Sequence, residues 1–403
     1  MRGSVRLLAA AVATVALTAT GCGSDDPSPA PAAEPTIDIA TLDTGPYDAN
    51  PRDMGKPKNP GQAALMEAER LGNAMPLIVD IDPAFKYTGV FDTLAFIDAK
   101  TSVMKDFTDL SNFTEDAPDL ISGFGVYGRN DSDNLGIELV NTAMIFPTEQ
   151  HATEVAAALE RRDFGRDPLS QAVALPRYPQ AHAHWVQGKQ AIDVWVPLGR
   201  LVIFGAVFDQ AKTWFHKTDL TDLVTRVTTS LDKVVPALSA FHPTPPDKLM
   251  DQPMDIDGML GRTMVRPKEA QGEWLNAPGA YTGYAGVAFA SDPAETRRWF
   301  EENGVDRFAD YGNQLYRARD TAAAIKVRDE LGDPAKHMKR AAAPKNLPVA
   351  KCREYQGREK MAIRYYCSVY HGRYAAFAAG EQLLDAQQRI SAQYAILVKA
   401  DGK

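Results

Sequence analysis

Two stretches decide the fold: DVWVPLGRLVIFG at residues 193–205 and YCSVYHGRYAAFA at residues 366–378. They align at an offset of 173 residues, which places Gly199-Arg200 opposite Gly372-Arg373. Each stretch carries an alternating strand pattern on both sides of its Gly-Arg pair, which is typical of a β-hairpin. The sequence therefore contains the same hairpin twice.

Similar elements surround both hairpins. Apolar residues recur at helical spacing after each hairpin, over residues 220–238 and 383–397, and shorter helical patterns precede each hairpin. The motifs KYTG (86–89) and AYTG (280–283) begin the two units. The order strand, helix, hairpin, helix thus occurs twice, and we interpret it as an internal duplication. The first copy is longer by about 21 residues, which we place near the polar region between residues 108 and 134.

The hairpins predict an α+β fold with two similar domains, each a twisted antiparallel sheet with helices packed on one face. Clear helix signals support the second unit: Asp292 is expected as N-cap and Gly304 as the stop of one helix. Three prolines near residue 245 predict a break between the units. We predict the first domain at residues 61–242, a linker at 243–260 and the second domain at 261–403.

The N-terminus predicts export and a lipid anchor. Residues 1–21 have two arginines, an apolar run too short to span a bilayer, and small residues directly before Cys22. This boundary is typical of a bacterial lipoprotein signal peptide, after which Cys22 would carry acyl chains such as palmitate. Residues 22–60, rich in Pro and Ala, are predicted to form a tether. An ordinary cleaved signal, with Cys22 incidental, is the alternative.

The charge and the cysteines favour an acidic protein outside the cytoplasm. The formal charge is −8, and removal of residues 1–21 takes away Arg2 and Arg6 and leaves −10, which argues against nucleic acid as a partner. If Cys22 is lipidated, Cys352 and Cys367 remain, and an oxidising compartment favours a disulfide between them. We expect the protein to be extracytoplasmic and anchored to the cell membrane.

The chain resembles a known family at several places. The cysteine boundary, the Pro-rich tether, ALMEAERLGNAMPLIVDIDPAF (64–85), the two YTG motifs and the segment from Cys352 onward are similar to an uncharacterised family of two-domain secreted lipoproteins of mycolate-bearing actinobacteria. The resemblance covers nearly the whole chain. It implies an envelope location and a duplicated domain of unknown function, and it assigns no functional residues.

Catalytic motifs are absent from the sequence. There is no Gly-x-Ser-x-Gly, His-Glu-x-x-His or P-loop motif, and no Ser-x-x-Lys motif together with its partner motifs, so we assign no catalytic residue. GFGVYG (123–128) matches a dinucleotide-binding pattern, but a turn follows where a helix N-terminus should hold the phosphates. We interpret it as a glycine-rich strand and loop, and we expect no cofactor.

Two further patterns resemble parts of metal sites. His182 and His184 would leave the same face of a strand, but nothing nearby in sequence supplies a third ligand, although His151 or His216 could arrive through folding. MDIDG (254–258) lacks the ligand positions of a calcium loop. We interpret the histidines as part of a solvent-facing loop and MDIDG as a turn, and we expect no metal.

A basic segment is the strongest candidate for binding. Residues 336–373 contain ten Lys or Arg against two Glu, in an otherwise acidic chain, with four interleaved tyrosines and a fifth, Tyr374, directly after them. Guanidinium groups beside aromatic rings can bind sugars, phosphates or carboxylates. Alternatively, the tyrosines are core and the cations a solvated face. The candidate ligand-binding residues are Arg353, Arg358, Arg364, Tyr366, Tyr370 and Arg373.

Together these features predict a non-enzymatic, membrane-anchored binding or scaffolding protein of the cell envelope. Its partners would be the membrane, through the lipid anchor, and an anionic envelope glycan or lipid. The alternative is an envelope hydrolase with an unrecognised site, for instance one that uses Asp80, Asp82 or the histidines as acid and base, because catalytic residues need only meet in space.

Overall fold

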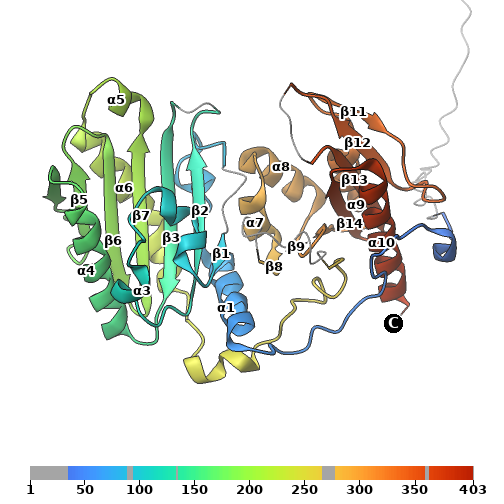
Figure 1. Cartoon of the computed structure of the whole chain (residues 1–403), viewed down its shortest axis with the longest axis horizontal. Coiled ribbons are helices and arrows are strands. Elements are labelled where there is room, and N and C mark those ends of the chain that lie inside the picture. Colours follow the sequence, from blue (N-terminus) through green and yellow to red (C-terminus); the bar gives the residue numbers. More distant parts are fainter. Residues whose placement is uncertain (1–34, 89–93, 133–134, 266–276, 359–362, 403) are drawn as a thin grey trace, which may run out of the picture. The chain divides into compact units, whose positions relative to one another are not determined.

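The computed structural model describes residues 35–88, 94–132, 135–265, 277–358 and 363–402. These residues form two seven-stranded antiparallel sheets (Figure 1). The first sheet consists of β1 (Ala95–Phe96), β2 (Ser122–Arg129), β3 (Ile137–Ile145), β4 (Ser170–Val173), β5 (His182–Val186), β6 (Ala191–Leu198) and β7 (Leu201–Asp209). The second consists of β8 (Gly279–Thr282), β9 (Arg307–Asp310), β10 (Gln314–Arg317), β11 (Met338–Ala341), β12 (Lys351–Tyr355), β13 (Tyr365–His371) and β14 (Tyr374–Gly380).

The described helices fall between and after these strands. The α-helices are α1 (Pro60–Ala74), α2 (Ile78–Ile81), α3 (Phe113–Asp116), α4 (Glu149–Gly165), α5 (Gln210–Trp214), α6 (Leu220–Ser239), α7 (Gly283–Gly286), α8 (Pro293–Asn303), α9 (Thr321–Gly332) and α10 (Leu383–Asp401). Short 3-10 helices are η1 (Ile39–Thr41), η2 (Ala99–Thr101), η3 (Val103–Asp106), η4 (Pro246–Asp251) and η6 (Val287–Phe289). None of the described helices has both the length and the apolar character needed to cross a membrane.

The two sheets have the same topology. The strand order is β1-β2-β3-β7-β6-β5-β4 in the first sheet and β8-β9-β10-β14-β13-β12-β11 in the second. Each strand of the first sheet thus has a counterpart seven strands later. Helices α4 and α9 occupy the same place in this order, as do α6 and α10. The α+β class, the two similar domains and the duplication are confirmed.

The duplicated hairpins turn in the same way. Gly199 and Gly372 have φ angles of 55° and 52°, in the left-handed region that favours glycine. The following arginines are also equivalent, because Arg200 Nε donates to Phe146 O and Arg373 Nε donates to Ala318 O, both at 2.9 Å. Phe146 and Ala318 directly follow β3 and β10. Arg373 therefore has a structural role that both copies share.

Helices cover both faces of each sheet, where the sequence led us to expect one helical face. In β6, Trp195 packs in the cluster that contains the apolar residues of α4, whereas Val194 and Val196 pack in the cluster that contains those of α6. Alternate strand residues point to opposite faces, so α4 and α6 lie on opposite sides of the first sheet. Most side chains of the central strands β3, β6 and β7 are then buried, and most of these buried residues are apolar.

The segment before α1 makes specific contacts, which shortens the predicted tether. Leu42 is buried, the Tyr47 hydroxyl donates to Asp385 in α10, and Lys399 Nζ donates to Ala49 O at 2.9 Å. The predicted tether at 22–60 is thus corrected, because residues from about 42 onward belong to the packed protein. Cys22 lies outside the described residues.

The linker is also attached to the fold. Thr244 is buried against α1, and the prolines that predict a break between the units precede and begin the short η4. A 3-10 helix tolerates proline in its first turn, where no backbone N–H is needed. The expected caps of α8 are confirmed: Asp292 accepts from Glu295 N, and Gly304 is left-handed.

Candidate functional site

The structure distributes the six predicted ligand-binding residues over different environments. Arg358 and Arg364 are exposed in the connection between β12 and β13, and Tyr366 is half-buried in β13. Tyr370 is buried, with the guanidinium carbon of Arg328 5.0 Å from its ring centroid. Arg353 is half-buried in β12 and donates to Asp333 O at 2.9 Å. With Arg373 held at the hairpin turn, the six do not form one cationic surface.

Acidic residues neutralise much of the basic segment. Lys351 Nζ lies 2.8 Å from Asp329 and 2.9 Å from Asp333, both outside the segment. Glu354 pairs with Lys339 at 3.1 Å and with Arg364 at 3.3 Å. The sequence could not predict the two pairs of Lys351. Asp329 lies in α9 and Asp333 in the loop after it, and both adjoin β12 only in the folded chain.

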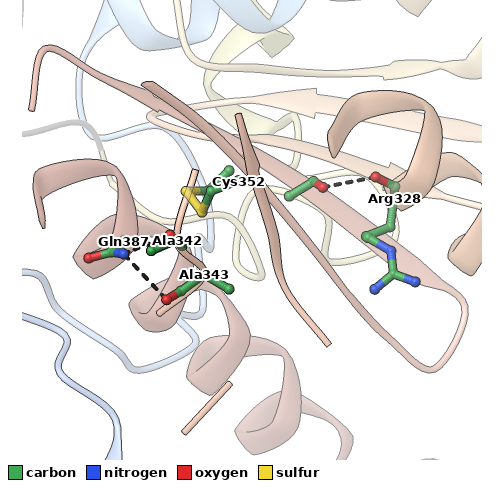
Figure 2. The surroundings of a disulfide bond; sticks show 7 residues. Arg328, Ala342, Ala343, Cys352 and Gln387 are labelled. Carbon is green, nitrogen blue, oxygen red and sulfur yellow. Dashed lines mark hydrogen bonds between the residues drawn. A yellow bond between two sulfur atoms is a disulfide. The ribbon is translucent and has the colours of Figure 1, made fainter. Parts of the chain in front are cut away.

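The expected disulfide is present. Cys352 in β12 and Cys367 in β13 are directly opposite each other, with their Cα atoms 4.1 Å apart. Figure 2 shows its surroundings: Gln387 of α10 donates to Ala342 O and Ala343 O. On β13, Ser368 donates to Arg328 O of α9. The disulfide thus links two strands that also contact both covering helices.

The second half contains an open pocket of about 600 Å³. It lies where the ends of β9, β10 and β14 meet the first turns of α10. Its lining combines one aromatic ring with acidic, amide and guanidinium groups: Asp310, Gly312, Asn313, Gln314, Ile363, Phe377, Ala379, Gly380, Glu381, Gln382, Asp385 and Arg389. A volume of this size suits a small molecule or a short segment of a polymer.

The walls of the pocket are held in place by contacts behind them. The ring of Tyr366 stacks on Phe377 with centroids 5.8 Å apart and planes inclined by 20°. Arg389 Nε donates to Asp385 at 2.9 Å, and the Tyr47 hydroxyl donates to the other oxygen of Asp385. Burial and the bond to Asp385 raise the pKa of Tyr47, so its hydroxyl stays a donor. One aromatic wall therefore faces a fixed carboxylate–guanidinium pair.

The pocket exists because the two copies differ at equivalent positions. Phe204, the counterpart of Phe377, is fully buried in a cluster with residues from η2, η3 and α3. Among the described residues, no counterpart of that cluster closes over Phe377, which is only partly buried. The strand registers make three cross-strand neighbours equivalent, with Gly125, Thr142 and Phe204 in the first sheet corresponding to Asp310, Gln314 and Phe377 in the second. Gly125 and Thr142, which are buried in the first half, thus correspond to Asp310 and Gln314, which line the open pocket in the second half.

A second candidate site is a buried cluster in the first half. His182 and His184 lie in β5, so the interpretation as a solvent-facing loop is wrong. His184 is 1% exposed, and it faces Asp193 of β6 and Asp163 of α4, which are 7% and 1% exposed. One possible ligand atom from each of these three residues lies within 4.8 Å of the others. His182, His151 and His216 are not part of this group.

Burial sets the protonation of this cluster. It raises the pKa of Asp193 well above its ordinary value, and the neighbouring Asp163 raises it further. Burial also raises the pKa of Asp163, although Arg166 and His184 oppose this effect. Burial lowers the pKa of His184, so its imidazole is neutral at pH 7 and has a lone pair available. The cluster therefore has the donor atoms of a metal site.

The other sequence candidates have structural roles. GFGVYG lies within β2, where a side chain at Gly123 or Gly128 would collide with Phe96 or Ile78. MDIDG forms a turn in which Asp255 accepts from Leu260 N and Gly261 N. Asp80 pairs with Arg297 in α8, and Asp82 lies 3.8 Å from Arg226 of α6. Neither aspartate lies in the pocket of the second half or in the buried cluster.

Sequence reasoning missed Asp163, Asp193 and Phe377. Asp193 offered a signal, because it is a charged residue at the start of an otherwise apolar strand pattern, DVWVPL. A charge in a buried strand needs a partner, and the duplicated hairpin has Tyr366 at that position. Asp163 offered none, since a helix surface normally contains acids.

Two family models match the chain. One, described as the N-terminal domain of unknown function DUF7373, matches residues 54–254, and the other, described as its C-terminal domain, matches residues 259–400. No curated protein matches the chain. Among solved structures, the chain is similar to the extracellular domain of PknH from Mycobacterium tuberculosis, with 8% identity, a TM-score of 0.27, and coverage of 41% of this chain and 96% of that chain. A similarity at this level supports no conclusion about function.

Proposed function

Because the chain belongs to the DUF7373 family, whose domains have no described function, we propose from its own geometry that it is a lipid-anchored extracytoplasmic binding protein. Its ligand occupies the pocket of the second half. One observation carries this proposal. Phe204 is buried in the first half, whereas its counterpart in the second half, Phe377, lines an open pocket of about 600 Å³. The disulfide and the cysteine boundary at residue 22 support the location.

The pocket chemistry favours a polyhydroxylated ligand such as a segment of an envelope glycan. The flat face of Phe377, backed by Tyr366, can pack against the C–H groups of a sugar ring. Carboxylate, amide and guanidinium groups around it can accept from and donate to hydroxyl groups. Because the pocket contains Asp310, Glu381 and Asp385 against one arginine, a neutral glycan suits it better than the anionic ligand expected from the basic segment.

The pocket is tested by the variant Phe377→Ala and its exposed aromatic control Phe215→Ala. Isothermal titration of the mature chain with neutral polysaccharide fractions of the envelope should give saturable binding. Loss of the central aromatic should weaken binding by about tenfold or more, and Phe215→Ala should leave it unchanged. Binding that Phe377→Ala does not affect contradicts the site. Mass spectrometry of the titrated glycan tests the hydrolase alternative, since cleavage products would contradict a non-enzymatic role.

The anchor is tested separately at Cys22. Mass spectrometry of the mature N-terminus should identify Cys22 as the first residue, with a mass increment of acyl chains. Cys22→Ala should move the protein from the membrane fraction to the soluble exported fraction or block its processing, because the acyl chains provide the membrane affinity. Ser24→Ala, two residues away, should leave the distribution unchanged. A wild-type protein that retains residues 1–21 in the cytosol contradicts the proposal.

A further inference from the structure

We propose that Asp163, His184 and Asp193 form a binding site for one divalent transition-metal ion. The site lies between α4 and the β5–β6 strand pair of the first half, and it is separate from the pocket proposed for the glycan. It provides one imidazole nitrogen and two carboxylate oxygens, a donor set that suits zinc or a similar first-row ion.

The spacing of the donor atoms supports a shared ion rather than direct hydrogen bonds. His184 Nε2 lies 3.7 Å from Asp163 Oδ2 and 3.9 Å from Asp193 Oδ2. Hydrogen bonds between such atoms are about 2.7–3.2 Å long. Two ligands of a tetrahedral zinc ion, each about 2.0–2.2 Å from the metal, are roughly 3.3–3.6 Å apart. A small closure of the three side chains would therefore give coordination geometry.

Unsatisfied polar atoms are an independent observation at the same place. Asp163 is buried, with only 1% of the residue exposed. Neither of its carboxylate oxygens makes a hydrogen bond within the described residues. Arg166 approaches Asp163 only to 3.6 Å, and Thr108 and the backbone N–H of Asp109 lie nearby without making a hydrogen bond of good geometry. Buried carboxylates are normally hydrogen-bonded, paired or bound to metal. At Asp163 both the hydrogen bonding and the ion pairing are incomplete.

The orientation of the imidazole fits metal binding through Nε2. Its other nitrogen, Nδ1, lies 3.8 Å from Glu160 Oε1 and has no hydrogen bond of its own. A carboxylate on the far side of a histidine holds the proton on Nδ1 and leaves Nε2 to the metal, an arrangement common around zinc. A divalent ion bound here would favour the charged form of the buried carboxylates, because its charge compensates theirs. The C-terminal end of α4 adds a negative dipole.

The second copy provides an internal comparison. In the strand registers, the cross-strand pair His184 and Asp193 corresponds to Arg353 and Tyr366. Arg353 satisfies its position by donating to Asp333 O after α9. The second copy thus has a fixed cation, Arg353, at the position where the first copy has the candidate ligand His184. We infer that the first copy takes its cation from solution.

The test uses the untagged mature chain, stripped of metal with a chelator and titrated with Zn²⁺ or Co²⁺ alone. We expect one ion per chain and a visible Co²⁺ absorption band. His184→Gln and Asp193→Asn should weaken binding by at least about tenfold. His182→Gln, two residues away on the same strand, should bind as the wild type does.

Absence of stoichiometric binding by the wild type overturns the proposal, and so does an equal loss in His182→Gln. If the ligand variants fail to fold by circular dichroism, Glu160→Gln decides, because it leaves all three ligands in place. It should retain one ion per chain with affinity lowered by about tenfold, and an affinity unchanged from wild type would contradict the assigned geometry.

Discussion

At the residue scale, one buried carboxylate joins α1 to the chain that connects the two halves. Glu67 is fully buried, and its two oxygens accept from Thr244 N at 2.7 Å and from Thr244 Oγ1 at 2.8 Å. Arg70 Nη1 pairs with the same carboxylate at 2.7 Å. The charge of Glu67 is thus compensated by Arg70, one turn later in α1, and by the two donors of Thr244, which only the fold brings to it.

The variant Glu67→Gln tests this network. It keeps one acceptor but removes the charge opposite Arg70 and places an amide donor against the Thr244 contacts. We expect the free energy of unfolding to fall by about 2–3 kcal/mol, as for a disrupted buried charge network. Urea denaturation followed by circular dichroism measures this. Glu154→Gln, at an exposed position of α4, should stay within about 0.5 kcal/mol of the wild type, and an equal effect of the two variants would contradict the role of burial.

At the element scale, the two copies hold equivalent cross-strand neighbours together in different ways. Cys352 and Cys367 are cross-strand neighbours between β12 and β13, and the corresponding neighbours between β5 and β6 are Ala183 and Val194. Both pairs are buried in the core. In the first copy apolar packing alone holds the pair, whereas in the second a covalent bond closes a loop of 15 residues.

We expect the double variant Cys352→Ala/Cys367→Ala to lose about 3 kcal/mol of stability in the chain-entropy model. The reason is that the open chain gains conformational freedom when it unfolds. Thermal and urea unfolding of the wild type with a reducing agent should shift in the same direction. The reducing agent should not shift the double variant, and a shift there would show that something other than this bond responds.

At the scale of the whole molecule, α1 contacts both sheets. Gly72 lies against the ring of Phe124 in β2, and Asn73 Oδ1 accepts from Thr282 N of β8 at 2.9 Å. Glu69 accepts from Ala280 N of β8 at 2.9 Å and is 3% exposed. Burial raises the pKa of Glu69 well above its ordinary value, although the bond from Ala280 opposes this effect. The contact between α1 and the second sheet therefore contains a carboxyl group that retains its proton.

This carboxyl makes stability depend on pH. In the unfolded chain Glu69 loses its proton near pH 4.3, whereas the folded chain holds it to higher pH, so stability falls as pH rises between the two pKa values by at most about 1.4 kcal/mol per pH unit. Glu69→Gln is neutral throughout and lacks this dependence. The stability of the variant relative to the wild type should therefore increase from pH 5 to pH 8 in urea denaturation. A difference that stays constant or decreases with pH contradicts the assignment.

Local signals in the sequence predicted elements well and sites poorly. Asp292 and Gly304 predicted the start and end of α8 because capping depends on a few adjacent residues. Gly199 and Gly372 predicted both turns for the same reason. The predicted basic surface was different, because its cations pair with Asp329 and other acids that adjoin it only in the folded chain. The second helical face was missed, although the continuous apolar run LVIFGAVF (201–208) is typical of a strand that is buried on both faces.

The sequence by itself determined the duplicated α+β architecture, the hairpins and the principal helices, because periodicity and turn residues are local properties of the chain. It also determined the disulfide pair, because only Cys352 and Cys367 remain once Cys22 is set aside. Only the tertiary structure decided which polar groups meet. His184, Asp163 and Asp193 come from three separate elements, and Phe377 lines a pocket where its counterpart Phe204 is covered. The physical reason is that the environment of a side chain depends on packing between elements distant in sequence.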